Sequence, residues 1–117
     1  MSKNGLDLFG KLLMNNIRDE AIDDWERIIE GKMRDEESQN IYKMLSDNER
    51  ELVKSLIPKI VDTTIHHLLW TIEQEEFIKV KVNDGTQYRN INKISDGLAG
   101  ELYTEDGWIS RFSKKTK

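Results

Sequence analysis

One apolar pattern of helical spacing runs from Ser46 to Glu76, and it constrains the fold more than any other feature of the sequence. Ser46 lies three residues before Glu49, which is the spacing of a capping box, in which each side chain accepts a hydrogen bond from the other residue's backbone amide. The pattern continues through Pro58, whose ring and missing amide are expected to kink the helix near 54–57 without breaking it. The sequence therefore predicts one long helix, kinked near Pro58.

The apolar residues of this helix form two rows, in each of which the positions differ by multiples of four. The first row is Leu52, Leu56, Ile60, Leu68 and Ile72, and the second is Val53, Ile57, Val61, Ile65 and Leu69. Because a helix turns about 100° per residue, each step of four overshoots one turn by about 40°, so both rows move around the helix. One flat partner cannot cover such rows, and the helix must be kinked or have neighbours on several sides.

The segments on either side of this helix complete the fold prediction. A chain of 117 residues has the size of one domain. Helical spacing of apolar residues predicts helices over 5–76, a change of spacing predicts a β-hairpin over 77–92, and a helical, aromatic segment is expected over 95–113. The expected fold is mainly α with a small β-hairpin (α+β), built as a helical bundle around the long central helix.

The hairpin prediction depends on alternating apolar residues. Ile78, Val80 and Val82 alternate with polar residues, which is typical of a strand with one face against the helices. An Asn-Asp-Gly sequence follows, so we expect strands near 77–82 and 86–91. A two-residue Asp-Gly loop is one alternative, but a three-residue loop is favoured because it keeps one face of the hairpin apolar.

Three polar residues share one face of the long helix and are the candidate catalytic residues. Asp62, His66 and Glu73 lie within about 40° of each other on a helical wheel, and the first two are four residues apart, so their side chains can meet. A carboxylate beside an imidazole can orient it as a base, and the three side chains are also possible ligands of a divalent metal. The chain has only two histidines and no cysteine. The favoured interpretation is a hydrogen bond between His66 and Asp62 at the edge of a packed helix, with no metal and no cofactor.

Two tryptophans are the candidate binding residues. Trp70 lies behind the main apolar face of the long helix, so it must be covered by another segment or exposed as an anchor for a partner. The aromatic C-terminal residues Tyr103, Trp108 and Phe112 are the expected cover. Trp70 and Trp108 are kept as candidates for a binding surface.

The stretch "ISDGLAGELYTEDGWISRFSKK", preceded by "VDTTIHHLLW", resembles a family of small bacterial proteins of no known activity. The resemblance extends over roughly the second half of the chain. It implies neither an activity nor any catalytic residue.

Composition and charge favour a protein-binding function. The formal net charge is −4 with acidic residues spread along the chain, so nucleic acid is not an expected partner. No segment approaches the ~20 apolar residues of a membrane span, and the first residues lack the unbroken apolar stretch of a signal peptide, so no membrane partner and a cytoplasmic location are expected.

Two hypotheses for function follow. The first is a small non-enzymatic protein-binding or regulatory protein, which includes the immunity type, with another protein or a second copy of the chain (a homodimer) as its partner. The alternative is a small enzyme or metal-binding protein that uses Asp62, His66 and Glu73.

Overall fold

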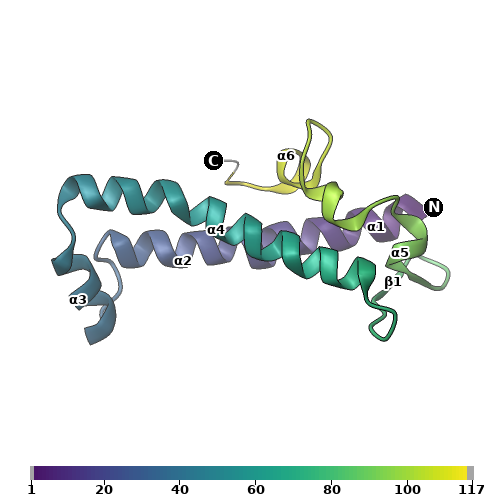
Figure 1. Ribbon diagram of the computed structural model, residues 1–117, viewed down its shortest axis with the longest axis horizontal. Helices are drawn as coiled ribbons and strands as arrows, with labels where there is room; N and C mark the ends of the chain where they lie inside the picture. The colour runs from purple at the N-terminus through teal and green to yellow at the C-terminus, as the bar shows by residue number, and fades with distance from the viewer. Residues whose placement is uncertain (1, 116–117) are drawn as a thin grey trace.

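The computed structural model describes residues 2–115. The molecule is elongated, with extents of 50 × 30 × 23 Å, and two long helical segments lie side by side along its length (Figure 1). The first segment consists of α1 (Ser2–Leu12), the π-helical η1 (Leu13–Arg18) and α2 (Asp19–Ile29), and α3 (Glu36–Met44) links it to the second, α4 (Asp47–Gln74).

Short elements of the C-terminal part cover one end of this pair. They are β1 (Lys81–Asn83), β2 (Tyr88–Asn90), α5 (Ile91–Ile94), the 3-10 helix η2 (Leu98–Leu102) and α6 (Trp108–Phe112). The η2 segment packs on α4, and β1, α5 and α6 pack on α1. The fold is therefore mainly α with a small β-hairpin, which confirms the prediction.

The long helix α4 begins at the predicted capping box. The Glu49 amide donates to Ser46 Oγ at 3.2 Å, and the Ser46 amide donates to Glu49 Oε1 at 2.7 Å. Pro58 lies inside the helix, which runs on without a break, and its axis changes direction along its length in Figure 1. None of the described helices is long and apolar enough to cross a membrane.

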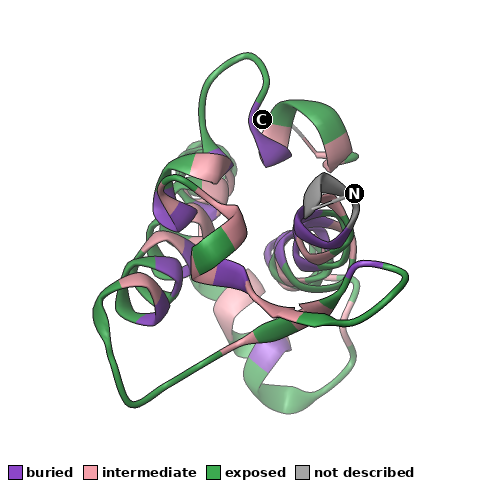
Figure 2. Cartoon of the chain, turned by 90° about the vertical axis from the view of Figure 1, so that its right-hand side faces the viewer, coloured by how far each residue is buried: buried purple, intermediate pink, exposed green. Residues whose placement is uncertain are grey.

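The buried residues form two clusters. Viewed along the long axis, exposed residues make up most of the loops and buried ones gather inside (Figure 2). The smaller cluster joins α2 to the first half of α4 through Ile22, Ile29 and Ile57. The larger one joins α1, η1 and the second half of α4 to the C-terminal elements, and Trp108 is fully buried in it. Its indole lies directly on Gly10, where an added Cβ would come within 2.4 Å of the ring.

The hairpin forms with a register that differs from both predicted ones. β1 and β2 are antiparallel with Val82 opposite Arg89, so the loop holds four residues, 84–87, rather than two or three. Val80 and Val82 pack against the core as predicted. Ile78 is 47% exposed, so its predicted inward position is wrong.

The side chain of Asp84 explains this register. Its Oδ1 accepts hydrogen bonds from the amides of Thr86 and Gln87 at 2.9 and 3.1 Å, and its Oδ2 pairs with the guanidinium of Arg89. Arg89, and then the hydroxyl of Thr86, hold the pKa of the Asp84 carboxyl well below its ordinary value. A buried carboxylate that closes its own loop therefore overrides the simple turn preference of Asn-Asp-Gly.

Candidate functional site

Of the three candidate catalytic residues on α4, Asp62 and Glu73 make hydrogen bonds to different partners. Asp62 accepts a bidentate pair from Arg18, so its predicted hydrogen bond to His66 is not made. Glu73 Oε1 accepts a hydrogen bond from the Ala99 amide at 3.1 Å, which ties α4 to η2. Within residues 2–115, no group of three His, Asp or Glu side chains is arranged to hold a metal ion.

His66 lies between these two contacts, beside the C-terminal segment. Its ring centroid is 5.9 Å from that of Tyr103, and its buried Nδ1 atom has no hydrogen-bond partner among the described residues. Burial, with a smaller contribution from the negative charge of Asp62, raises the pKa of Tyr103. Among the described residues, Asp62 and Glu73 are thus directed to Arg18 and to the Ala99 amide rather than to the imidazole of His66.

Arg18 forms a buried ionic centre that was not predicted from the sequence. The residue is 1% exposed. Its Nε donates to Asp62 Oδ1 at 2.5 Å and its Nη2 to Asp62 Oδ2 at 3.2 Å, while Nη1 donates to Asp19 Oδ1 at 3.3 Å. The Arg18–Asp62 pair thus joins η1 to α4, and it is largely shielded from water.

The same centre holds the C-terminal residues against the helices. Arg18 Nη1 also donates to Ser113 Oγ at 2.7 Å and to the Lys115 carbonyl oxygen. Asp19 accepts from Ser113 Oγ at 2.6 Å and from the Lys114 amide at 2.7 Å. All three guanidinium nitrogens of Arg18 thus have hydrogen-bond partners within the chain.

The two tryptophans have opposite environments. Trp70 is 49% exposed, so the expectation that the C-terminal aromatic residues cover it is wrong. It lines a shallow surface depression between α4 and η2, together with Ala99 and Gly100. Trp108 is fully buried against Gly10 and offers no surface to a partner.

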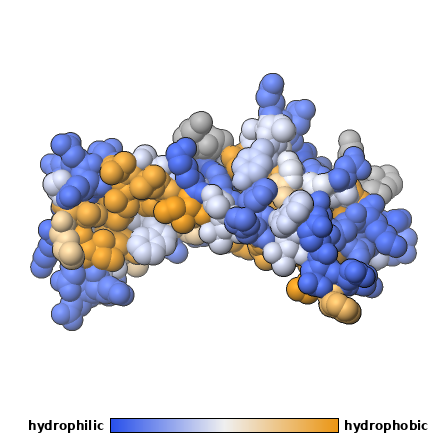
Figure 3. All heavy atoms as spheres, viewed as in Figure 1, coloured by the Kyte–Doolittle hydropathy of each residue, from blue (hydrophilic) through white to orange (hydrophobic). Residues whose placement is uncertain are grey.

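A further apolar surface lies on the arm formed by α2 and the first half of α4. We define the α2–α4 apolar face as Trp25, Leu52, Leu56 and Ile60. These side chains are 41–61% exposed. Trp25 and Ile60 also line an apolar groove between the two helices, together with Val53, Ile57 and Val61. Figure 3 shows that hydrophobic residues gather on the surface of the arm formed by α2, α3 and the first half of α4.

The size of this face points to a function. Four large side chains left about half exposed offer roughly 400 Å² of apolar surface, and the largest patch on a monomeric protein, about 300–600 Å², is often functional. The two rows of apolar residues on α4 indicated this surface, because one row is buried by α2 and the other, at Leu52, Leu56 and Ile60, has no cover among the described residues.

Comparisons with known proteins identify no relative. No family model matches the chain, and no similar protein is found among the curated proteins or the solved structures. The resemblance of the C-terminal half to a family of small bacterial proteins stays a prediction.

Proposed function

We propose that the protein is a non-enzymatic protein-binding protein, of the regulatory class that includes immunity-type proteins, and that it acts through the α2–α4 apolar face. The observation that carries this proposal is the bare row of Leu52, Leu56 and Ile60 beside Trp25. Layers of helices are stable when each apolar stripe is buried against another element, and no element among residues 2–115 buries this row. A partner helix seated there would complete the layer by helix-in-groove recognition.

The charges that border the row favour a second copy of the chain as the partner. Glu49 lies three residues before Leu52, and Lys59 lies three residues after Leu56. The four residues fall within about 80° of each other on a helical wheel. Both charged residues are exposed, and Lys59 makes no ion pair among the described residues.

An antiparallel α4 from a second copy, with Leu52 opposite Leu56, would place Glu49 opposite Lys59 at both ends of the contact. A two-fold axis requires such self-complementarity, because each residue of one copy meets its counterpart in reverse order. The homodimer would bury Trp25 and Ile60 of both copies at its edges and would form a bundle from two helical arms.

Sedimentation equilibrium of the purified protein tests this proposal. The wild type is expected to dimerise, and Leu56→Asp to be monomeric, because the substitution puts a charge at the centre of the contact. Lys59→Glu should weaken the dimer about tenfold or more, since it turns two favourable pairs of roughly 0.5 kcal/mol into repulsions. Adding Glu49→Gln should restore part of the affinity, because glutamine keeps the capping hydrogen bond and removes the repulsion.

Lys43→Glu, which makes the same charge change on α3, is the matched control and should leave the equilibrium unchanged. A wild type that is monomeric at about 200 µM would exclude the second copy as the partner. If capture from the native cells then retained the same proteins on Leu56→Asp as on the wild type, the face would have no binding function and the proposal would be wrong.

A further inference from the structure

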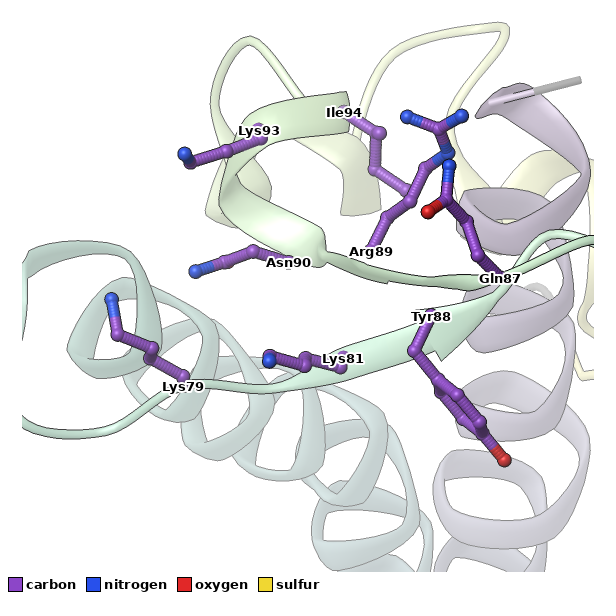
Figure 4. Close-up of a pocket in the computed structure, with 8 residues that line it drawn as sticks. All are labelled: Lys79, Lys81, Gln87, Tyr88, Arg89, Asn90, Lys93 and Ile94. Carbon is purple, nitrogen blue, oxygen red and sulfur yellow. The ribbon is translucent and has the colours of Figure 1, made fainter.

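A second surface, at the opposite end of the molecule, has the chemistry of an anion site. The hairpin and α5 surround a pocket lined by Lys79, Lys81, Gln87, Tyr88, Arg89, Asn90, Lys93 and Ile94. None of these residues is acidic, although the whole chain has a formal net charge of −4. Figure 4 shows the nitrogen atoms of Lys79, Lys81, Asn90 and Lys93 on the same side of the hairpin, around one opening.

The three lysines are free to bind a ligand. None of them forms an ion pair among residues 2–115. Arg89 differs, because its guanidinium is held by the buried carboxylate of Asp84. Three unpaired ammonium groups close together raise the local positive potential, and a bound anion would relieve their mutual repulsion.

Asn90 supplies a donor of fixed direction. Its Oδ1 accepts a hydrogen bond from the Asn92 amide at 2.9 Å and caps α5. Because an amide N–H can only donate, this bond identifies the oxygen of the Asn90 side chain and leaves Nδ2 as a donor toward the lysines. The pocket is also anchored to the core, since Val80 and Ile94 beside it pack against the large buried cluster.

We infer that this pocket binds a dianionic phosphate group. Three ammonium groups and one amide match the several acceptor oxygens and double charge of a phosphate, whereas a carboxylate offers one charge and two oxygens. The group could be part of a free phosphorylated small molecule or of a phosphomonoester lipid headgroup. Phe77, two residues before Lys79 and 94% exposed, is an apolar group that a bilayer could accept.

An NMR titration of the full chain with inorganic pyrophosphate, at constant ionic strength and pH 7.5, tests the inference. We expect saturable shifts of the amides in 79–93 and a Kd below about 1 mM. Asn90→Asp keeps the oxygen that caps α5 and replaces the donor by a carboxylate, so it should weaken binding at least tenfold while the fold is retained. Lys79→Ala with Lys93→Ala should do the same.

Lys11→Ala with Lys43→Ala removes two exposed charges elsewhere and is the matched control, which should bind as the wild type does. Co-sedimentation with phosphatidylcholine vesicles, with and without phosphatidic acid, distinguishes the sources. Binding that needs phosphatidic acid and is displaced by pyrophosphate assigns the lipid, and pyrophosphate binding alone assigns a free ligand. A linear, unsaturated response, or equal affinities for the wild type and Asn90→Asp, would overturn the inference.

Discussion

Replacement of Arg18 by methionine removes the guanidinium and keeps an apolar stem of similar length in the core. The change leaves the carboxylates of Asp19 and Asp62 without their cation, at side-chain exposures of 8% and 19%. Breaking a buried ion pair by removing one partner costs about 3–5 kcal/mol. Since Asp62 is partly hydrated, we expect a loss near the lower limit, about 3 kcal/mol.

Equilibrium unfolding in urea measures this loss, which is a large part of the 5–15 kcal/mol that is typical of a native domain. The matched control is Lys32→Met, because Lys32 is 64% exposed and pairs with Glu30 on the surface. Exposed pairs contribute about 0–1 kcal/mol. Removing both charges, in Arg18→Met with Asp62→Leu, should recover part of the stability, since no unpaired carboxylate then remains at Asp62.

The reasoning would be refuted by a loss below about 1 kcal/mol for Arg18→Met, or by a loss equal to that of Lys32→Met. Either result would show that water or other groups replace the guanidinium without cost. The slope m should be the same in all variants, because a change in m would indicate a different unfolded or native state.

Four further predictions concern the core, the hairpin and the candidate residues on α4. Gly10→Ala should cost about 1–3 kcal/mol in urea unfolding, because the new methyl group meets the indole of Trp108. Trp108→Ala should cost about 3–5 kcal/mol, as large core truncations do, and Trp70→Ala clearly less, about 1–2 kcal/mol; similar losses for the two would contradict their different burial. The lowered pKa of Asp84 means that its carboxylate stabilises the hairpin above the ordinary carboxyl pKa of about 4 and that this stabilisation is lost as the pH falls toward the lowered value. NMR shifts of the loop amides should therefore stay constant through the ordinary carboxyl range and change only well below about pH 4, and in Asp84→Asn the loop should already be altered at neutral pH. Calorimetric titration with Zn²⁺ should give no Kd below about 1 µM, and tight binding that disappears in His66→Ala would show a metal site.

Local interactions explain the parts of the fold that the sequence predicts well. The capping box of Ser46 and Glu49 involves residues three apart, and its hydrogen bonds need no tertiary contact. The rows on α4 likewise follow from helical geometry alone. The capping box therefore predicts where the long helix begins, and the two rows predict which of its residues are apolar contacts.

The parts that were missed depend on contacts between distant residues. Arg18 and Asp62 are 44 positions apart, and the mostly polar stretch 15–20 around Arg18 is ordinarily interpreted as the exposed side of a helix. The sequence does not show that Trp108 meets a glycine almost a hundred positions away, Gly10, which leaves room for its ring. Arg18 is the last residue of the π-helical segment η1, and such segments are frequent at functional sites in helices. The π-helical geometry is seen in the structure and has no counterpart in the sequence pattern.

The antiparallel contact between two copies of α4 is the central claim, and an intermolecular paramagnetic NMR measurement tests it most directly. The chain has no cysteine, so Thr63→Cys gives a single attachment point for a nitroxide at the exposed edge of the proposed contact. Equal amounts of the labelled protein and unlabelled, nitrogen-15 enriched protein are mixed at about 200 µM. The account predicts broadening of amides near 45–52 in the enriched copy, because an antiparallel partner brings the start of α4 next to position 63. Broadening confined to the C-terminal half of α4, or no broadening while the labelled chain remains folded, would contradict it.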